Sequence, residues 1–148
     1  MDADIRQAHN IPAAAFAWRF TVGSELIDIQ DRVSNHAIVE ILSDAAWEHS
    51  KSLGWDIDDY RQLGKWWVVR RHEVDYLASA VEGDELTCYT WPSGITRATA
   101  QRRHMLVRAD GTAIASAMNT WAVVDMTTGK PCRIPPELAQ AFDPAKFA

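Results

Sequence analysis

Cysteine is scarce in this sequence. The chain has two cysteines, Cys88 and Cys132, among its 148 residues, which is too few for a disulfide framework or a zinc site. A chain of this length buries enough surface to fold without such crosslinks. We therefore expect a single domain over residues 1–148 in a reducing, cytoplasmic compartment.

Long apolar runs and an excess of basic residues are also missing. No segment approaches the roughly 20 apolar residues of a transmembrane helix. The N-terminus, with Asp2 and Asp4, lacks the basic and apolar regions of a signal peptide. The net charge of -5 argues against nucleic acid as the main partner. We expect neither nucleic acid nor a membrane as a partner, although a few local cations can still bind an anionic ligand.

Tryptophan, in contrast, is abundant, with seven residues. Large aromatic side chains provide much contact area, so they indicate a deep core, an apolar pocket or a subunit interface. Four of them are candidates to line an apolar slot: Trp47, Trp66, Trp67 and Trp121. Packing in the core or in a dimer interface is an equally good interpretation of these four.

The pattern of apolar residues predicts one strand, one long helix and then four more strands. The expected strands are 16–29, 66–74, 86–91, 96–107 and 113–125. The helix begins at Ser34 or Asn35, buries Ile38, Ile41, Leu42 and Ala45, and ends at Gly54. Residues 1–14 and 55–64 are expected to be irregular, Pro92-Ser93-Gly94 to interrupt the pattern, and residues 137–142 to form a short helix. Because the long helix is the only available cover for the sheet, we expect an α+β fold with a five- or six-stranded antiparallel sheet wrapped around it.

Several short motifs occur in an order that is specific to one superfamily. The segment from Asp28 to Asn35 resembles a motif of Asp, two variable residues, Gly, then His-Val-Asn-Asn or a variant ending in His. Here Asp31 replaces the Gly and Arg32 the first His. Further matches are 73–77, 83–86, 108–111, 121–125, 129–131 and 133–135. Together, over residues 16–142, they resemble the 4-hydroxybenzoyl-CoA thioesterase-like branch of the hot-dog superfamily, and they are also similar to acyl-ACP thioesterases.

This resemblance implies a hydrolase that cleaves an acyl-CoA or acyl-carrier-protein thioester. It also implies a homodimer or a dimer of dimers, with sheets joined edge to edge and sites between subunits. No metal or redox cofactor is implied, because coenzyme A enters as part of the substrate. The alternatives are a hot-dog hydratase or dehydratase, and a protein that binds acyl-CoA or another lipophilic ligand without turnover.

The resemblance assigns catalysis to Asp28, as nucleophile or as general base on a water. A turn residue is the alternative interpretation of an aspartate at this position. Asn35 would position the carbonyl or the water, and its alternative is a helix cap. Asp44 is a second candidate because some hot-dog thioesterases use a carboxylate on the helix. Its spacing of four from Glu40 and Glu48 is also typical of a solvated helix face.

Substrate binding has two expected components. The backbone N–H groups of His36, Ala37 and Ile38, in the first turn of the helix, would stabilise the oxyanion. Three arginines are candidates for the phosphates of coenzyme A: Arg97, Arg102 and Arg103. Adjacent strand residues point to opposite faces, so at most one of the last two can serve a given site. The alternative for each arginine is ordinary solubilising charge.

Overall fold

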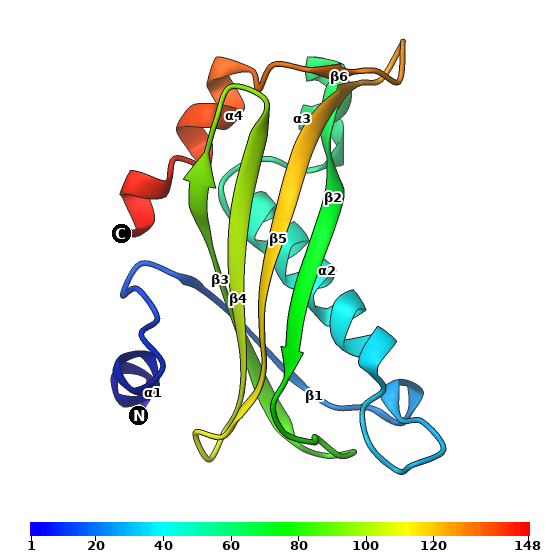
Figure 1. Cartoon of the computed structure of the whole chain (residues 1–148), viewed down its shortest axis with the longest axis vertical. Coiled ribbons are helices and arrows are strands. Elements are labelled where there is room, and N and C mark those ends of the chain that lie inside the picture. Colours follow the sequence, from blue (N-terminus) through cyan, green and yellow to red (C-terminus); the bar gives the residue numbers. More distant parts are fainter.

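A computed structural model describes all residues, 1–148, and shows a long sheet curved around one long helix (Figure 1). The elements in chain order are α1 Asp2–Ala8, β1 Phe16–Thr21, η1 Ser24–Leu26, α2 Asn35–Ser52, α3 Ile57–Leu63, β2 Lys65–Tyr76, β3 Glu85–Ile95, β4 Thr99–Arg108, β5 Ala113–Asp125, β6 Pro131–Cys132, α4 Pro136–Ala141 and η2 Pro144–Phe147. The sheet is antiparallel, has six strands in the order β1-β3-β4-β5-β2, and carries β6 on β5. The predicted α+β architecture is confirmed.

The long helix α2 lies across the concave face of this sheet (Figure 1). Its buried face includes the predicted stripe of Ile38, Ile41, Leu42 and Ala45 and continues to His49 and Ser50. These residues recur every three or four positions, which is the spacing of one face of an α-helix. The packing therefore follows from the sequence, except that the last turn buries polar side chains.

Two expected strands have different bounds in the structure. The first strand ends at Thr21 and not near residue 29, because the chain turns there into η1 and a loop. The third strand continues through Pro92 to Ile95, with a register shift between Pro92 and Gly94. Pairing with β1 stops at Thr90, so this part of β3 has a free edge. Proline is tolerated at such an edge because no partner strand needs its missing N–H.

Two segments that were expected to be irregular contain helices. Residues 55–64 form α3, which begins with a capping box between Asp56 and Asp59 and ends at Gly64 in the left-handed region at φ 75°. Within residues 1–14, α1 is tied down by Arg6, which donates hydrogen bonds to the carbonyls of Pro12, Ala13 and Ala15. The expectation that these two segments are irregular was wrong, because short helices held by caps and tertiary contacts leave little periodicity in the sequence.

The core between α2 and the sheet has two parts. The first half of α2 packs Ile38, Ile41 and Leu42 against inward residues of β3, β4 and β5. Beyond the second half lies a separate cluster that includes Tyr60, Leu138 and Phe142. No helix in the structure is long and apolar enough to cross a membrane.

Candidate active site at the start of the long helix

The loop before α2 is held in a defined turn that presents Asp28. Ile27 and Val33 form an isolated antiparallel bridge. The Asp28 N–H donates to the Arg32 carbonyl at 2.9 Å, and the Asp31 N–H donates to the Asp28 carbonyl at 3.1 Å. Asp31 has φ 59°, which explains a departure from the motif: the position requires the left-handed region, and aspartate is among the few residues other than glycine that enter it.

Asp28 and Asn35 line the same cavity, of about 580 Å³. Asp28 is half-buried, and its Oδ1 accepts a hydrogen bond from the Gln30 N–H at 2.8 Å. The other carboxylate oxygen has no partner in the protein. The turn thus fixes the carboxylate while leaving one oxygen free, as a general base or nucleophile requires.

The first turn of α2 differs from the expected oxyanion site. Ser34 is the cap, since its Oγ accepts a hydrogen bond from the Ala37 N–H at 3.1 Å. The Ile38 N–H donates to the Ser34 carbonyl, and the His36 N–H donates to Asn35 Oδ1 at 3.0 Å. The three N–H groups predicted to be unpaired are therefore occupied. The N–H of Asn35 itself has no acceptor, and it is the free donor at this end of the helix.

Two further side chains shape the cavity. The Tyr76 hydroxyl donates to the Asn35 carbonyl at 3.3 Å and connects the end of β2 to the helix start. Tyr76 lies in a recognised motif, but sequence reasoning gave it no role. Arg32 donates to Gln30 Oε1 at 2.7 Å and to Ser79 Oγ at 3.2 Å, and it forms no ion pair.

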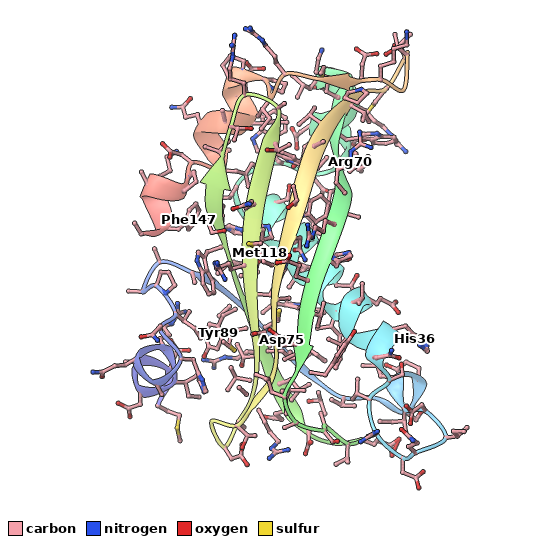
Figure 2. All side chains as sticks on the ribbon, viewed as in Figure 1. His36, Arg70, Asp75, Tyr89, Met118 and Phe147 are labelled. Atoms are coloured by element: carbon pink, nitrogen blue, oxygen red, sulfur yellow. The ribbon has the colours of Figure 1, made fainter.

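The other predicted site residues lie apart from Asp28. Asp44 is exposed on α2, about 13 Å along the axis from Asn35 by helix geometry. Partial burial, followed by the charges of Glu40 and Glu48, raises the pKa of Asp44. His36 is exposed, and Figure 2 shows its side chain at the start of α2. No group of three or more His, Cys, Asp or Glu side chains is arranged to hold a metal ion.

The three predicted arginines are not brought together. Arg97 is exposed in the β3–β4 turn, at the opposite end of the sheet from the loop before α2 (Figure 1). Arg103 is exposed, whereas its neighbour Arg102 is buried, which confirms that the two point to opposite faces. Arg102 was predicted to contact a nucleotide phosphate, but its guanidinium lies inside the fold, facing a second cavity.

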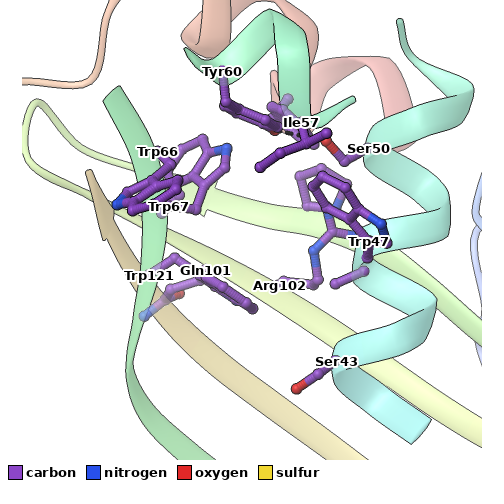
Figure 3. A pocket seen from close by; sticks show the side chains of 14 residues that line it. Ser43, Trp47, Ser50, Ile57, Tyr60, Trp66, Trp67, Gln101, Arg102 and Trp121 are labelled. Atoms are coloured by element: carbon purple, nitrogen blue, oxygen red, sulfur yellow. Dashed lines mark hydrogen bonds between the residues drawn. The ribbon is translucent and has the colours of Figure 1, made fainter. Parts of the chain in front are cut away.

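This second cavity, of about 250 Å³, lies between the later turns of α2, α3 and the sheet (Figure 3). Its walls are mostly apolar and include all four tryptophans predicted to line a slot: Trp47, Trp66, Trp67 and Trp121. Its polar lining residues are Ser43, Ser50, Tyr60, Gln101 and Arg102. An apolar slot with a few polar groups is the usual form of a small-molecule pocket.

Arg102 is held in this cavity by neutral groups. Its Nη1 donates to His49 Nδ1 at 2.9 Å and to Thr90 Oγ1 at 3.0 Å. Burial, followed by the charge of Arg102, lowers the pKa of His49 to about 3, so the imidazole is neutral and can accept this bond. Burial also lowers the pKa of Arg102 to about 10, and the guanidinium is therefore charged at neutral pH.

The sequence profile of the acyl-ACP thioesterase N-terminal domain matches residues 13–142. The chain belongs to the acyl-ACP thioesterase family. No curated protein sequence matches this family member. The profile covers both the loop with Asp28 and the tryptophan-lined cavity.

Several solved structures have the same fold as this chain. A putative oleoyl thioesterase from Lactobacillus plantarum superposes with a TM-score of 0.83 at 22% identity, over 88% of this chain and 51% of that protein. The 12:0-ACP thioesterase from Umbellularia californica superposes with a TM-score of 0.76 at 20% identity, over 88% of this chain and 53% of that protein. The DHNA-CoA thioesterase from Staphylococcus aureus superposes with a TM-score of 0.81 at 15% identity, over 89% of this chain and 91% of that protein. These likenesses establish the hot-dog fold, and this family member spans about half the length of the first two proteins.

Proposed function

We propose that this protein hydrolyses an acyl thioester, carried by coenzyme A or by an acyl-carrier protein, to a free acid and a thiol. The observation that carries the proposal is the shared cavity of Asp28 and Asn35 at the start of α2. Membership of a thioesterase family supports it. Both kinds of carrier occur among the similar structures, a DHNA-CoA thioesterase and a 12:0-ACP thioesterase.

The chemistry requires few groups. A thiol leaves readily because its pKa is about 8.5, so a strong general acid is unnecessary. As a nucleophile, Asp28 displaces the thiolate and forms an acyl anhydride, which a water then hydrolyses to the free acid and the regenerated carboxylate. As a general base, it removes a proton from the water that attacks the carbonyl, and the proton passes to the departing thiolate. The unpaired N–H of Asn35, at the positive end of the α2 dipole, stabilises the oxyanion that forms. In this scheme neither a metal nor a redox cofactor takes part.

We also propose that the protein acts as a homodimer or a dimer of dimers. Strand β2 is an edge of the sheet and exposes Trp66, Val69 and Tyr76. An unpaired edge with apolar side chains favours pairing with another strand.

The decisive experiment measures thiol release from acyl-CoA and acyl-ACP substrates of different chain length. We expect release by the wild type and a decrease of about 10²- to 10⁴-fold in Asp28→Asn, because the base or nucleophile is lost while the Gln30 hydrogen bond can remain. Asp31→Asn is the matched control. It changes an exposed carboxylate of the same turn and keeps a residue that tolerates a positive φ.

Equal loss in both variants would assign the effect to the turn and not to the Asp28 carboxylate. Full activity in Asp28→Asn would move the chemistry to another group, with Asp44 as the next candidate. Absence of thiol release from every substrate, together with tight binding of acyl-CoA, would favour a binding protein without turnover.

A further inference from the structure

Arg102 is a buried cation without a counter-charge. Its residue is only 7% exposed, and none of the ion pairs in the structure includes it. Its two hydrogen-bond partners, His49 and Thr90, are neutral. Buried arginines are normally paired, because an uncompensated ion in a protein interior is costly.

The guanidinium of Arg102, a residue that lines the cavity, retains unused donors. Nη1 makes both hydrogen bonds of Arg102, which leaves Nε and Nη2 without an acceptor in the protein. The Trp121 indole N–H in the same wall is also buried without a partner. The Trp67 N–H lies near the Tyr60 oxygen, without hydrogen-bond geometry. Unpaired buried donors such as these two indole N–H groups are rare in native structures, and both tryptophans line a space that a ligand can fill.

The rest of the wall fits a hydrocarbon. Figure 3 shows Trp66, Trp67 and Trp121 on the sheet side of the cavity and Trp47 on α2. Ser43 is the lining residue nearest the helix start, and it lies about 12 Å along the axis from Asn35 by helix geometry. An acyl chain that has its thioester at the helix start must cover at least this distance before its far end enters the cavity.

We propose that the cavity takes the far end of an acyl group that terminates in a second carboxylate, and that Arg102 binds this carboxylate. The inference rests on the proposed thioester function and defines its substrate class. A carboxylate accepts two parallel hydrogen bonds from a guanidinium, so it can pair with the N–H groups of Nε and Nη2, which have no acceptor in the protein. The tryptophans enclose the methylene chain, and the ion pair removes the isolated charge from the interior.

Binding can be tested without turnover by titrating the intrinsic tryptophan fluorescence. The probes are the monomethyl and dimethyl esters of decanedioic acid, which share one chain and differ by one carboxylate. We expect the wild type to bind the monomethyl ester about ten- to a hundredfold more tightly than the dimethyl ester. This ratio corresponds to the free energy that a hydrogen bond to a charged group contributes. Equal affinity for the two esters would overturn the proposal.

Variants assign the preference to one residue. Arg102→Met keeps most of the side-chain volume but removes the charge, so we expect it to abolish the preference for the monomethyl ester. Arg102→Lys keeps a cation, so we expect a weaker preference to remain. Arg103→Met is the matched control, because it removes the neighbouring arginine from the outer face. A preference that survives in Arg102→Met, or disappears in Arg103→Met, would contradict the proposal. If Arg102→Met does not fold, loss of the preference in Arg102→Lys would contradict it.

Turnover separates this inference from the function on which it rests. Thiol release is compared for decanoyl-CoA and the ω-carboxy derivative of the same length, and we expect wild type to favour the latter and Arg102→Met to lose this preference. Release from both at equal rates, without selective binding, would refute the carboxylate specificity and leave the thioesterase standing. Selective binding without release from either would refute the thioesterase and leave the ligand site standing.

Discussion

The two ends of α2 carry two different kinds of site. At its start, the cavity of about 580 Å³ is lined by one segment that includes Asp28 and Asn35, seven positions apart, and by residues 76–79 at the end of β2. Beyond its middle, the cavity of about 250 Å³ combines residues of α2, α3, β2, β3, β4, β5 and the C-terminal segment. The lining of the first site is mostly polar, and that of the second is mostly apolar.

This difference matches the two roles proposed above for the two ends of α2. Reaction chemistry needs a carboxylate and a free N–H at a helix start, which a short loop can position. Selection of an acyl group needs enclosure, and enclosure requires side chains from several strands and helices. A helix with a continuous buried face fixes the distance between the two sites.

The largest expected effect tests whether these two sites act separately. Asp28→Asn is expected to decrease thiol release about 10²- to 10⁴-fold while the affinity for monomethyl decanedioate, measured by fluorescence, stays within about twofold because distant sites contribute independently. A parallel loss of affinity for monomethyl decanedioate would mean that the two cavities form one cooperative unit, and it would contradict the view that they act separately.

The same division explains what the sequence could predict. The site at the start of α2 was accessible because its motif lies in one short segment, and the strands and buried stripe followed from periodicity. Arg102 was predicted to bind a coenzyme A phosphate, with solubilising charge as the alternative, since arginine is rarely buried and one strand position does not reveal a cavity behind it. The occupied N–H groups of Ala37 and Ile38 also escaped prediction, because the choice between Ser34 and Asn35 as the cap depends on backbone geometry.

A smaller effect is expected in how the free energy of unfolding depends on pH, and it should distinguish the two ends of α2. Burial, as the largest cause, lowers the pKa of both His49 and His104 from 6.5 to about 3. As the pH falls below 6.5 the unfolded chain binds protons that the native protein does not, so stability decreases towards pH 3. Each histidine is expected to contribute about 1.4 kcal/mol per pH unit to the loss. Urea unfolding between pH 7 and pH 5 measures this slope.

A variant of His49 measures how much this helix residue contributes to the loss of stability at low pH. His49→Gln removes one titrating group and keeps an acceptor for Arg102, so the slope of stability against pH is expected to decrease by about half. His36→Gln, which changes an exposed histidine at the other end of α2, should leave the slope unchanged. An unaltered slope in His49→Gln would show that another group carries the acid sensitivity.

The smallest expected effect concerns the side-chain cap at the start of α2. Ser34→Ala removes the acceptor of the Ala37 N–H and is expected to lower the free energy of unfolding by about 1 kcal/mol. Ser52→Ala is the matched control at the other end of α2, where the hydroxyl donates to the His49 carbonyl and the side chain is exposed. Thiol release should decrease in Ser34→Ala alone, because only this cap fixes the backbone next to the Asn35 N–H. Equal decreases in both variants would mean that general helix stability, and not the local geometry at Asn35, controls the reaction.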